Sequence, residues 1–197
     1  MPYKQIDNLL TIAESTSASY PPRTYYNATS SDLTVAFAVD FTTAGERLTA
    51  KAAKGKYLAI PLGMNIDEAA VQISESLKKI SKCNLPFIDA DGLIINIAGN
   101  SIDTLNASGW TQAKANKYLF RVLRRLNRLA NLAQVKTGGQ TGIDIAGAIA
   151  AYAINLPIHV TLPKGFKQRK DGVDFTQTED DVVDQIVSGA AKLKDKT

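Results

Sequence analysis

Buried-strand and amphipathic-helix patterns alternate along most of this chain. Continuous apolar runs predict strands at DLTVAFAVD, KYLAIPL, DGLIINIAGN, AQVKTGG and IHVTLPKG. Helices are predicted between and after them, at TTAGERLTAKAAKG, NIDEAAVQISESLKKISK, TQAKANKYLFRVLRRLNRLANLA, IDIAGAIAAYAINL and TEDDVVDQIVSGAAKLK. Strands that alternate with helices indicate βαβ units. We therefore expect an α/β, Rossmann-like three-layer domain with a mainly parallel sheet of about five or more strands.

The first 30 residues do not follow this alternation. One short amphipathic segment, QIDNLLTIAES, is followed by the turn-rich SASYPPRTYYNATSS, in which the Pro21–Pro22 pair is expected to prevent a helix. We predict an N-terminal arm over residues 1–30 with little core of its own, and a single domain over 31–197. The long helical pattern at 110–133 would join the two halves of that domain, 31–109 and 134–197.

Composition excludes several classes of protein. The 197 residues, 45% of them hydrophobic and 21% charged, suit a globular domain, and a net charge of +4 slightly favours anionic ligands. With Cys83 the only cysteine and His159 the only histidine, we expect no metal, no cofactor and no disulfide framework. No apolar stretch approaches about 18 residues, and the N-terminus lacks a secretory signal pattern. We therefore expect a cytoplasmic protein with no membrane partner.

A glycine-rich loop directly precedes the alanine-rich helix pattern. Glycine permits close approach of a ligand to the backbone, and the N-terminus of the following helix attracts anions. The residues expected to hold a phosphate are Gly138, Gly139, Gln140, Thr141 and Gly142, with Asp144 available to a sugar hydroxyl. The alternative is a tight strand–helix turn whose glycines serve packing only.

Three further loops at strand ends carry polar groups that suit a phosphate or a ribose. The first could equally be an ordinary helix N-cap, in which Glu46 closes a capping box. The candidates are Thr42, Thr43, Gly45 and Glu46 in the first loop, Asn96, Gly99 and Asn100 in the second, and Lys164 in the third.

Several common catalytic motifs are absent. The chain has no G-x-x-x-x-G-K-[ST], no G-x-G-x-x-G and no G-x-S-x-G, which argues against P-loop NTPases, classical dinucleotide dehydrogenases and α/β-hydrolases. His159 lies in the middle of a predicted strand, alternating with apolar residues, and we expect it to be structural.

Basic residues recur at three- and four-residue steps along the predicted helix 110–133. A solvated helix face explains this stripe most simply, and the alternatives are a phosphate-binding wall or a track for nucleic acid. Trp110 and Tyr118 lie nearby, but no interleaved basic–aromatic pattern appears. The stripe consists of Lys114, Lys117, Arg121, Arg124, Arg125 and Arg128.

The segment KTGGQTGIDIAGAIAAYAINLPIHVTLPKG resembles the S-G-G-Q-T-G-x-D-x-A opening of the molybdenum-cofactor carrier group in the Rossmann-like SLOG superfamily. The GGQTG motif, Asp144 and Pro163-Lys164-Gly165 all match. The later elements of that family also have counterparts here, but these come first in the chain, at DLTVAFAVDFTTAGERLTAKAAKGKYLAIPL and IINIAGNS. The chain therefore resembles a circularly permuted SLOG domain over residues 30 to 170.

This resemblance implies a range of activities. SLOG relatives bind nucleotides, nucleotide-derived signals or single-stranded DNA, and some cleave N-glycosidic bonds. The arginine that commonly follows the motif's aspartate is Ile145 here, and FTTAGE stands where the phosphoribohydrolase branch has P-G-G-x-G-T-x-x-E.

We expect binding of a nucleotide or nucleotide-derived phosphate compound, such as an ADP-ribose-type signal, by a homo-oligomer. One alternative is an N-glycosidic hydrolase that activates water with Glu46 or Asp40. The other is a single-stranded nucleic-acid binding protein that uses the arginine stripe.

Overall fold

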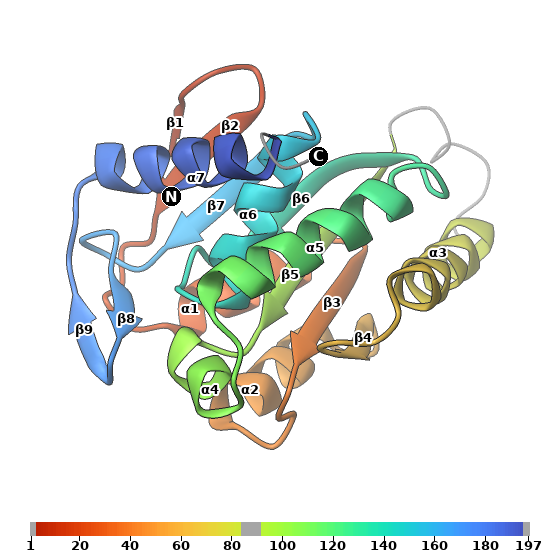
Figure 1. Cartoon of the computed structure of the whole chain (residues 1–197), viewed down its shortest axis with the longest axis horizontal. Coiled ribbons are helices and arrows are strands. Elements are labelled where there is room, and N and C mark those ends of the chain that lie inside the picture. The colour runs from red at the N-terminus through yellow and green to blue at the C-terminus, as the bar shows by residue number, and fades with distance from the viewer. Residues whose placement is uncertain (1–2, 84–91, 195–197) are drawn as a thin grey trace.

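The chain folds around one seven-stranded sheet (Figure 1). The computed structural model describes residues 3–83 and 92–194, and the side chains of residues 3, 4 and 81–83 lie outside that description. The strand order is β1-β2-β7-β6-β5-β3-β4, with every neighbouring pair parallel except β1 and β2. The strands are β1 (Tyr3–Gln5), β2 (Leu10–Glu14), β3 (Leu33–Ala38), β4 (Tyr57–Pro61), β5 (Leu93–Gly99), β6 (Leu132–Thr137) and β7 (Ile158–Leu162).

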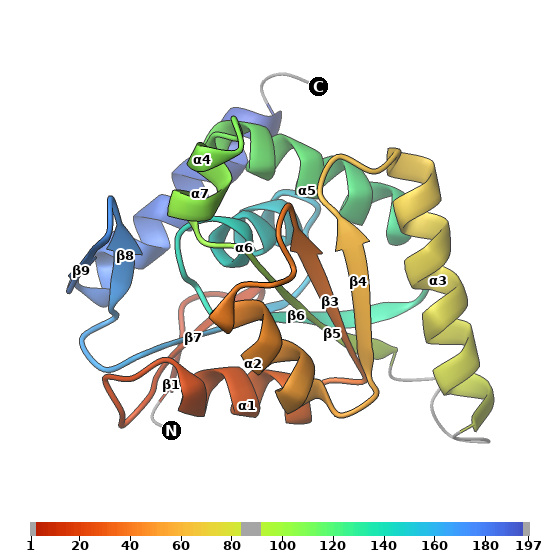
Figure 2. The same ribbon diagram turned by 90° about the horizontal axis from the view of Figure 1, so that it is seen from below.

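Helices cover both faces of the sheet, which confirms the predicted α/β three-layer class. Figure 2 shows α1 and α2 on one face and α5, α6 and α7 on the other. The helices within the described residues are α1 (Pro21–Thr29), α2 (Ala44–Ala53), α3 (Ile66–Cys83), α4 (Ile102–Ala107), α5 (Gln112–Leu126), α6 (Ile143–Ala153) and α7 (Glu179–Lys194).

The alanine-rich helix α6 lies in the middle of the molecule. Ten of its eleven residues are buried, because the sheet covers one side of it and α5 and α7 pack against the others. A helix that is apolar all round is typical of such a position. Its small side chains allow the flanking helices to approach closely, so the alanine content of this segment is explained by packing.

The prediction of an N-terminal arm over residues 1–30 is wrong. Strand β2 pairs in parallel with β7 over five residues, and its Leu10 and Ile12 belong to the main hydrophobic core. The segment that begins at Pro21 is helix α1. Proline fits the first turn of a helix, because the amide hydrogen that it lacks has no partner there in any case.

One helix boundary differs from the prediction, and two further elements were not predicted. The long helix is α5 and ends at Leu126, not at residue 133, because Leu132–Thr137 pair with β5 as strand β6. The short helix α4 follows β5. After β7 the chain forms a small antiparallel hairpin, β8 (Gln168–Lys170) with β9 (Val173–Phe175), that the sequence pattern did not indicate.

The loops after β3 and β6 open on the same edge of the sheet. Both strands are parallel to β5, which lies between them, so the carboxyl ends of all three meet. Residues almost a hundred positions apart in the sequence line one pocket there. The fold thus gathers the loop residues that the sequence pattern selected.

Candidate ligand-binding pocket

A pocket of about 420 Å³ lies at the carboxyl ends of β3, β5 and β6, on the side of the sheet that α1 and α2 cover. Small residues form part of its lining, among them Ala98 on β5 and Gly138 after β6. Because these residues are small, the pocket can form between the sheet and the side chains of α1 that line it. A concave site at this edge of a parallel sheet is the usual place for a ligand.

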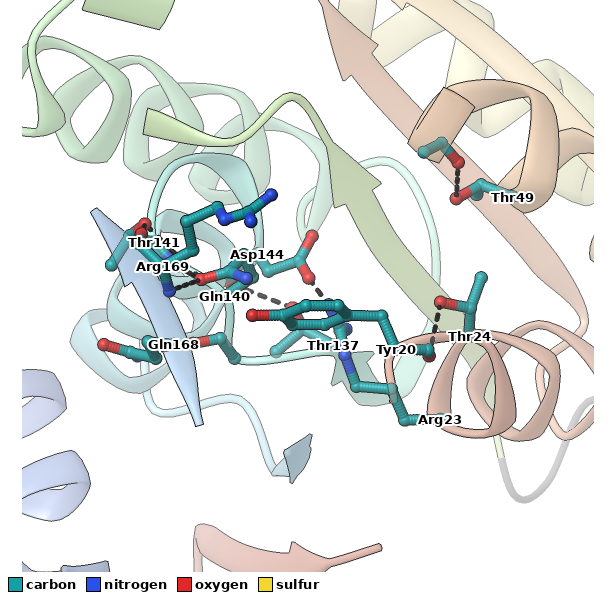
Figure 3. A network of polar contacts seen from close by, with 12 residues as sticks. Tyr20, Arg23, Thr24, Thr49, Thr137, Gln140, Thr141, Asp144, Gln168 and Arg169 are labelled. Carbon is teal, nitrogen blue, oxygen red and sulfur yellow. Dashed lines mark hydrogen bonds and ion pairs between the residues drawn. The ribbon is translucent and has the colours of Figure 1, made fainter. Parts of the chain in front are cut away.

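Helix α1 contributes a buried cation to the pocket. Arg23 Nη1 donates a hydrogen bond of 3.0 Å to Asp144 Oδ2, in the first turn of α6, and both side chains are at least nine-tenths buried. Figure 3 shows Arg23 reaching from α1 toward Asp144, with the Tyr20 ring alongside. Burial raises the pKa of Asp144, and the Arg23 guanidinium acts against that rise.

Gly138 makes this ion pair possible. A Cβ at position 138 would lie 1.2 Å from Arg23 Nη1 and 2.4 Å from Asp144 Oδ2, so the guanidinium occupies the space that any other residue would fill. The space beside the first glycine of the GGQTG motif is therefore occupied by the Arg23 side chain, and not by a phosphate as the motif suggested.

Glu46 does not form the capping box that its spacing suggested. The amide of Glu46 donates to Thr43 Oγ1 at 3.2 Å, which gives α2 its N-cap. The carboxyl group instead turns into the pocket, 3.5 Å from Asn100 Nδ2, and only 2% of the residue is exposed. Burial, with a smaller effect of the nearby Asp144, raises the pKa of Glu46 from 4.5 to about 8. Glu46 is therefore mainly protonated at neutral pH.

Three side chains of the pocket carry polar atoms that have no partner among the described residues. They are Arg23 Nε, Asn27 Oδ1 and Glu46 Oε2, in residues that are 7%, 2% and 2% exposed. A buried polar atom without a hydrogen bond costs about 1–3 kcal/mol, so such atoms are rare and need an explanation. Their convergence on one pocket indicates a polar ligand.

The N-terminus of α2 also faces the pocket. The amides of Ala44 and Gly45 lie in the first turn, where a helix offers no acceptor, and no other acceptor for them occurs in the described residues. A Cβ at Gly45 would meet no atom within 4 Å, so the space beside it is open. This helix end can hold an anion.

The N-terminus of α6, by contrast, is closed by the protein. The amide of Gly142 donates to Gln112 Oε1 at 2.7 Å, that of Thr141 to Gln140 Oε1 at 2.9 Å, and that of Ile143 to the Asn100 carbonyl at 3.1 Å. Gly142 (φ 103°) packs against the loop that precedes α4. Of the amides expected to cradle a phosphate, those of Thr141 and Gly142 thus have protein partners.

Gly139 faces away from the pocket. Its φ of 68° suits glycine, and a Cβ there would meet Val160 and Leu162 of β7 at 2.7 and 2.8 Å. A larger side chain at 139 would therefore disturb the core behind the sheet. The expectation that Gly139 lies against the ligand is therefore wrong. Gly138, one residue earlier, lines the pocket instead.

The hairpin β8–β9 adds a second arginine to the pocket. Arg169 lines it, and the backbone amide of Arg169 donates to Gln140 Oε1 at 2.6 Å, so the motif's glutamine fastens the hairpin to the loop (Figure 3). Arg169 Nε also contacts Asp174 Oδ1 at 3.0 Å. Tyr20 donates to the same carboxylate at 2.9 Å, which joins the hairpin to the start of α1.

The structure brings most, but not all, of the predicted site residues together. Asp40 accepts hydrogen bonds from the amide and hydroxyl of Thr42, which lower the pKa of its carboxyl group, and neither residue lines the pocket. Lys164 is exposed on another part of the surface. The predicted residues that line the pocket are Thr43, Gly45, Glu46, Asn96, Gly99, Asn100, Gly138, Gln140 and Asp144; those that do not are Asp40, Thr42, Gly139, Thr141, Gly142 and Lys164.

Tyr20, Arg23, Asn27 and Arg169 were missed. The first three lie in a stretch taken for an arm, and Arg169 in a hairpin whose strands have only three residues each. The signal that could have found the first three is the Pro21–Pro22 pair, interpreted as the start of a helix with Arg23 and Asn27 four residues apart on one face.

None of the helices in the described ranges combines the length and apolar character needed to cross a bilayer. His159 is half-buried under α1, where burial and the nearby Lys136 lower its pKa to about 4, and it does not line the pocket. Searches against protein-family models, curated proteins and solved structures give no match to this chain.

Proposed function

We propose that the pocket binds a nucleotide or a nucleotide-derived sugar phosphate. The observation that carries this proposal is the set of buried, unpartnered polar atoms on Arg23, Asn27 and Glu46 around one cavity. A volume of about 420 Å³ suits a small molecule of this size class. The resemblance to the SLOG superfamily supports the same ligand class.

The two ends of the pocket suit different parts of such a ligand. At the inner end, Glu46 is mainly protonated and the charges of Arg23 and Asp144 offset each other, so this region favours neutral hydroxyl groups. Toward the α2 end, the free amides of Ala44 and Gly45 suit a phosphate. Arg169, which lines the pocket on the side of the β8–β9 hairpin, adds positive charge. We infer that the sugar lies inside and the phosphate near α2.

Hydrolysis of an N-glycosidic bond is the second candidate, and one observation favours it. Glu46 is a buried carboxylic acid of the pocket lining with a pKa of about 8, and its Oε2 has no hydrogen-bond partner among the described residues. A group with these properties can give a proton to a leaving base or take one from water. Of the two carboxyl groups considered from the sequence, Glu46 lies in the pocket and Asp40 does not.

One experiment separates binding from turnover. The purified protein is incubated with AMP and with ADP-ribose, and free base is measured by chromatography. We expect binding by calorimetry and no release of base above the uncatalysed rate. If free base is released, and this release is lost in Glu46→Gln but kept in the control Asp40→Asn, the protein is a hydrolase and the proposal of binding alone is wrong. Absence of binding to both compounds, in a folded protein, would contradict the proposal.

A further inference from the structure

The positive charge of the chain is concentrated on helix α5 and its flanks. Residues 111–130 contain six basic side chains and no acidic one, whereas the rest of the chain has 17 basic and 19 acidic residues. The net positive charge of the protein thus originates on this one segment. A single-sign surface of this kind attracts a polyanion over several ångströms.

Four of these side chains form the α5 cationic face: Lys117, Arg121, Arg124 and Arg128. All four are exposed, and within the part of the chain that the structure describes none has a carboxylate within ion-pair distance. Arg125 differs, because its Nε contacts Asp67 Oδ1 at 2.6 Å. At a rise of about 1.5 Å per residue, the face extends over roughly 16 Å.

Two hollows flank the face, with volumes of about 440 and 380 Å³. Both are lined by Phe120, Arg124 and Arg128. Phe120 is only 8% exposed, and the Arg124 guanidinium lies 5.9 Å from the centre of its ring. No large apolar side chain of either hollow is exposed. The apolar lining residues Ile66, Ile154 and Leu193 are only partly exposed, and basic side chains surround them, so the charge complementarity favours a polyanion.

The aromatic side chains near the face are buried or partly buried. Tyr118 is 8% exposed and donates its hydroxyl to the Met64 carbonyl at 3.0 Å. The ring of Trp110 packs edge-on against Tyr118, with centroids 5.7 Å apart. Single-strand binding normally uses stacked bases. The described surface therefore suits contacts to phosphates alone.

We propose that the α5 cationic face binds the phosphate backbone of double-stranded nucleic acid. Helix α5 lies on the opposite side of the sheet from the pocket (Figure 2), so this partner is separate from the small-molecule ligand. Arginine suits phosphate oxygens because its planar fork can donate two hydrogen bonds. With about four phosphates neutralised, the logarithm of the binding constant is expected to fall with the logarithm of salt concentration at a slope of about −3.6.

The test compares two triple variants on a labelled, mixed-sequence DNA duplex of about 20 base pairs, over a salt series. Arg121→Gln/Arg124→Gln/Arg128→Gln removes three charges from the face. Lys51→Gln/Lys54→Gln/Lys56→Gln removes three exposed charges near the end of α2 and is the matched control. We expect the arginine variant to lose at least about 10-fold in affinity at low salt and its slope to shrink toward about −0.9, while the control keeps a slope near that of the unchanged protein.

Three results would overturn the proposal. One is equal loss in the two variants, which would mean that net charge alone attracts the duplex. Another is tighter binding of the corresponding single strand, and the last is tighter binding of polyglutamate of similar charge. Circular dichroism and thermal unfolding of both variants establish that they are folded, which is expected because every substituted residue is exposed.

Discussion

Replacing Glu46 with glutamine is expected to make the folded protein more stable at pH 8, while changing its stability little at pH 4.5. The buried carboxyl group is neutral when protonated, and glutamine reproduces that neutral shape. Burial and the nearby Asp144 oppose ionisation of Glu46 and raise its pKa from 4.5 to about 8. Ionisation of Glu46 at higher pH therefore disfavours the folded state.

The sign of this effect follows from proton binding. Because the pKa of Glu46 is higher in the folded than in the unfolded chain, the folded state holds an additional proton between pH 4.5 and about 8. The stabilisation is complete below pH 4.5 and is lost as the pH rises through 8. At about 1.4 kcal/mol per pH unit, the loss over this window is on the order of 3–5 kcal/mol.

Urea unfolding of the two proteins across this pH range measures the difference. Asp144, whose pKa is also raised by burial, is present in both proteins, so the difference between them reports Glu46 together with its coupling to Asp144. We expect the free energy of unfolding to fall more steeply with pH for the unchanged protein than for Glu46→Gln. Parallel curves would mean that Glu46 is ionised and hydrated in the pocket.

Asp144→Asn is expected to destabilise the protein by about 3–5 kcal/mol, the usual result of breaking a buried ion pair. The substitution leaves the Arg23 cation nine-tenths buried without a counter-charge. Arginine cannot lose its proton in a protein, so this charge cannot be removed by titration. Urea unfolding at neutral pH gives the magnitude.

Two further variants test the cause of that loss. Arg23→Met removes the other partner, and the loss should be smaller, because Asp144 can take up a proton once its counter-charge is gone. Gly138→Ala changes no charge but places a Cβ where Arg23 Nη1 lies, so it should also destabilise. If Arg23→Met proves as destabilising as Asp144→Asn, or Gly138→Ala proves neutral, the buried ion pair does not stabilise the fold in the way inferred.

The strands and helices of the sheet could be predicted because their patterns are strong and local. Leu33–Ala38 is a continuous buried run, and α3 and α5 show clear helical periodicity. Strand β2 lies in a short amphipathic segment next to a turn-rich stretch, with no helix pattern recognised after it. The strands of the β8–β9 hairpin have three residues each and no clear alternation of buried and exposed positions, so neither β2 nor the hairpin stands out from the sequence. The predicted helix 110–133 and the predicted strand AQVKTGG overlap at residue 133; in the structure the helix ends at Leu126, and Leu132 already pairs with β5.

The pocket was only half predictable. Loop residues at strand ends were found, since parallel topology alone brings those ends together. The roles within the GGQTG motif were not, because they depend on contacts from distant segments: Arg23 occupies the space above Gly138, Gln112 closes the amide of Gly142, and Gln140 holds Arg169. Such contacts between distant residues leave no periodic trace in the sequence.

Native mass spectrometry of the protein purified from cells, before and after addition of AMP or ADP-ribose, tests the central claim most directly. Asn27→Leu is the paired variant, because it replaces the buried carboxamide whose oxygen has no partner with an apolar side chain of similar size. We expect a bound nucleotide-sized mass on the unchanged protein, at least about 10-fold weaker binding by the variant, and equal or greater thermal stability of the variant. A folded, unchanged protein that carries no such mass and binds neither compound, or a variant that binds as tightly as the unchanged protein, would contradict the account.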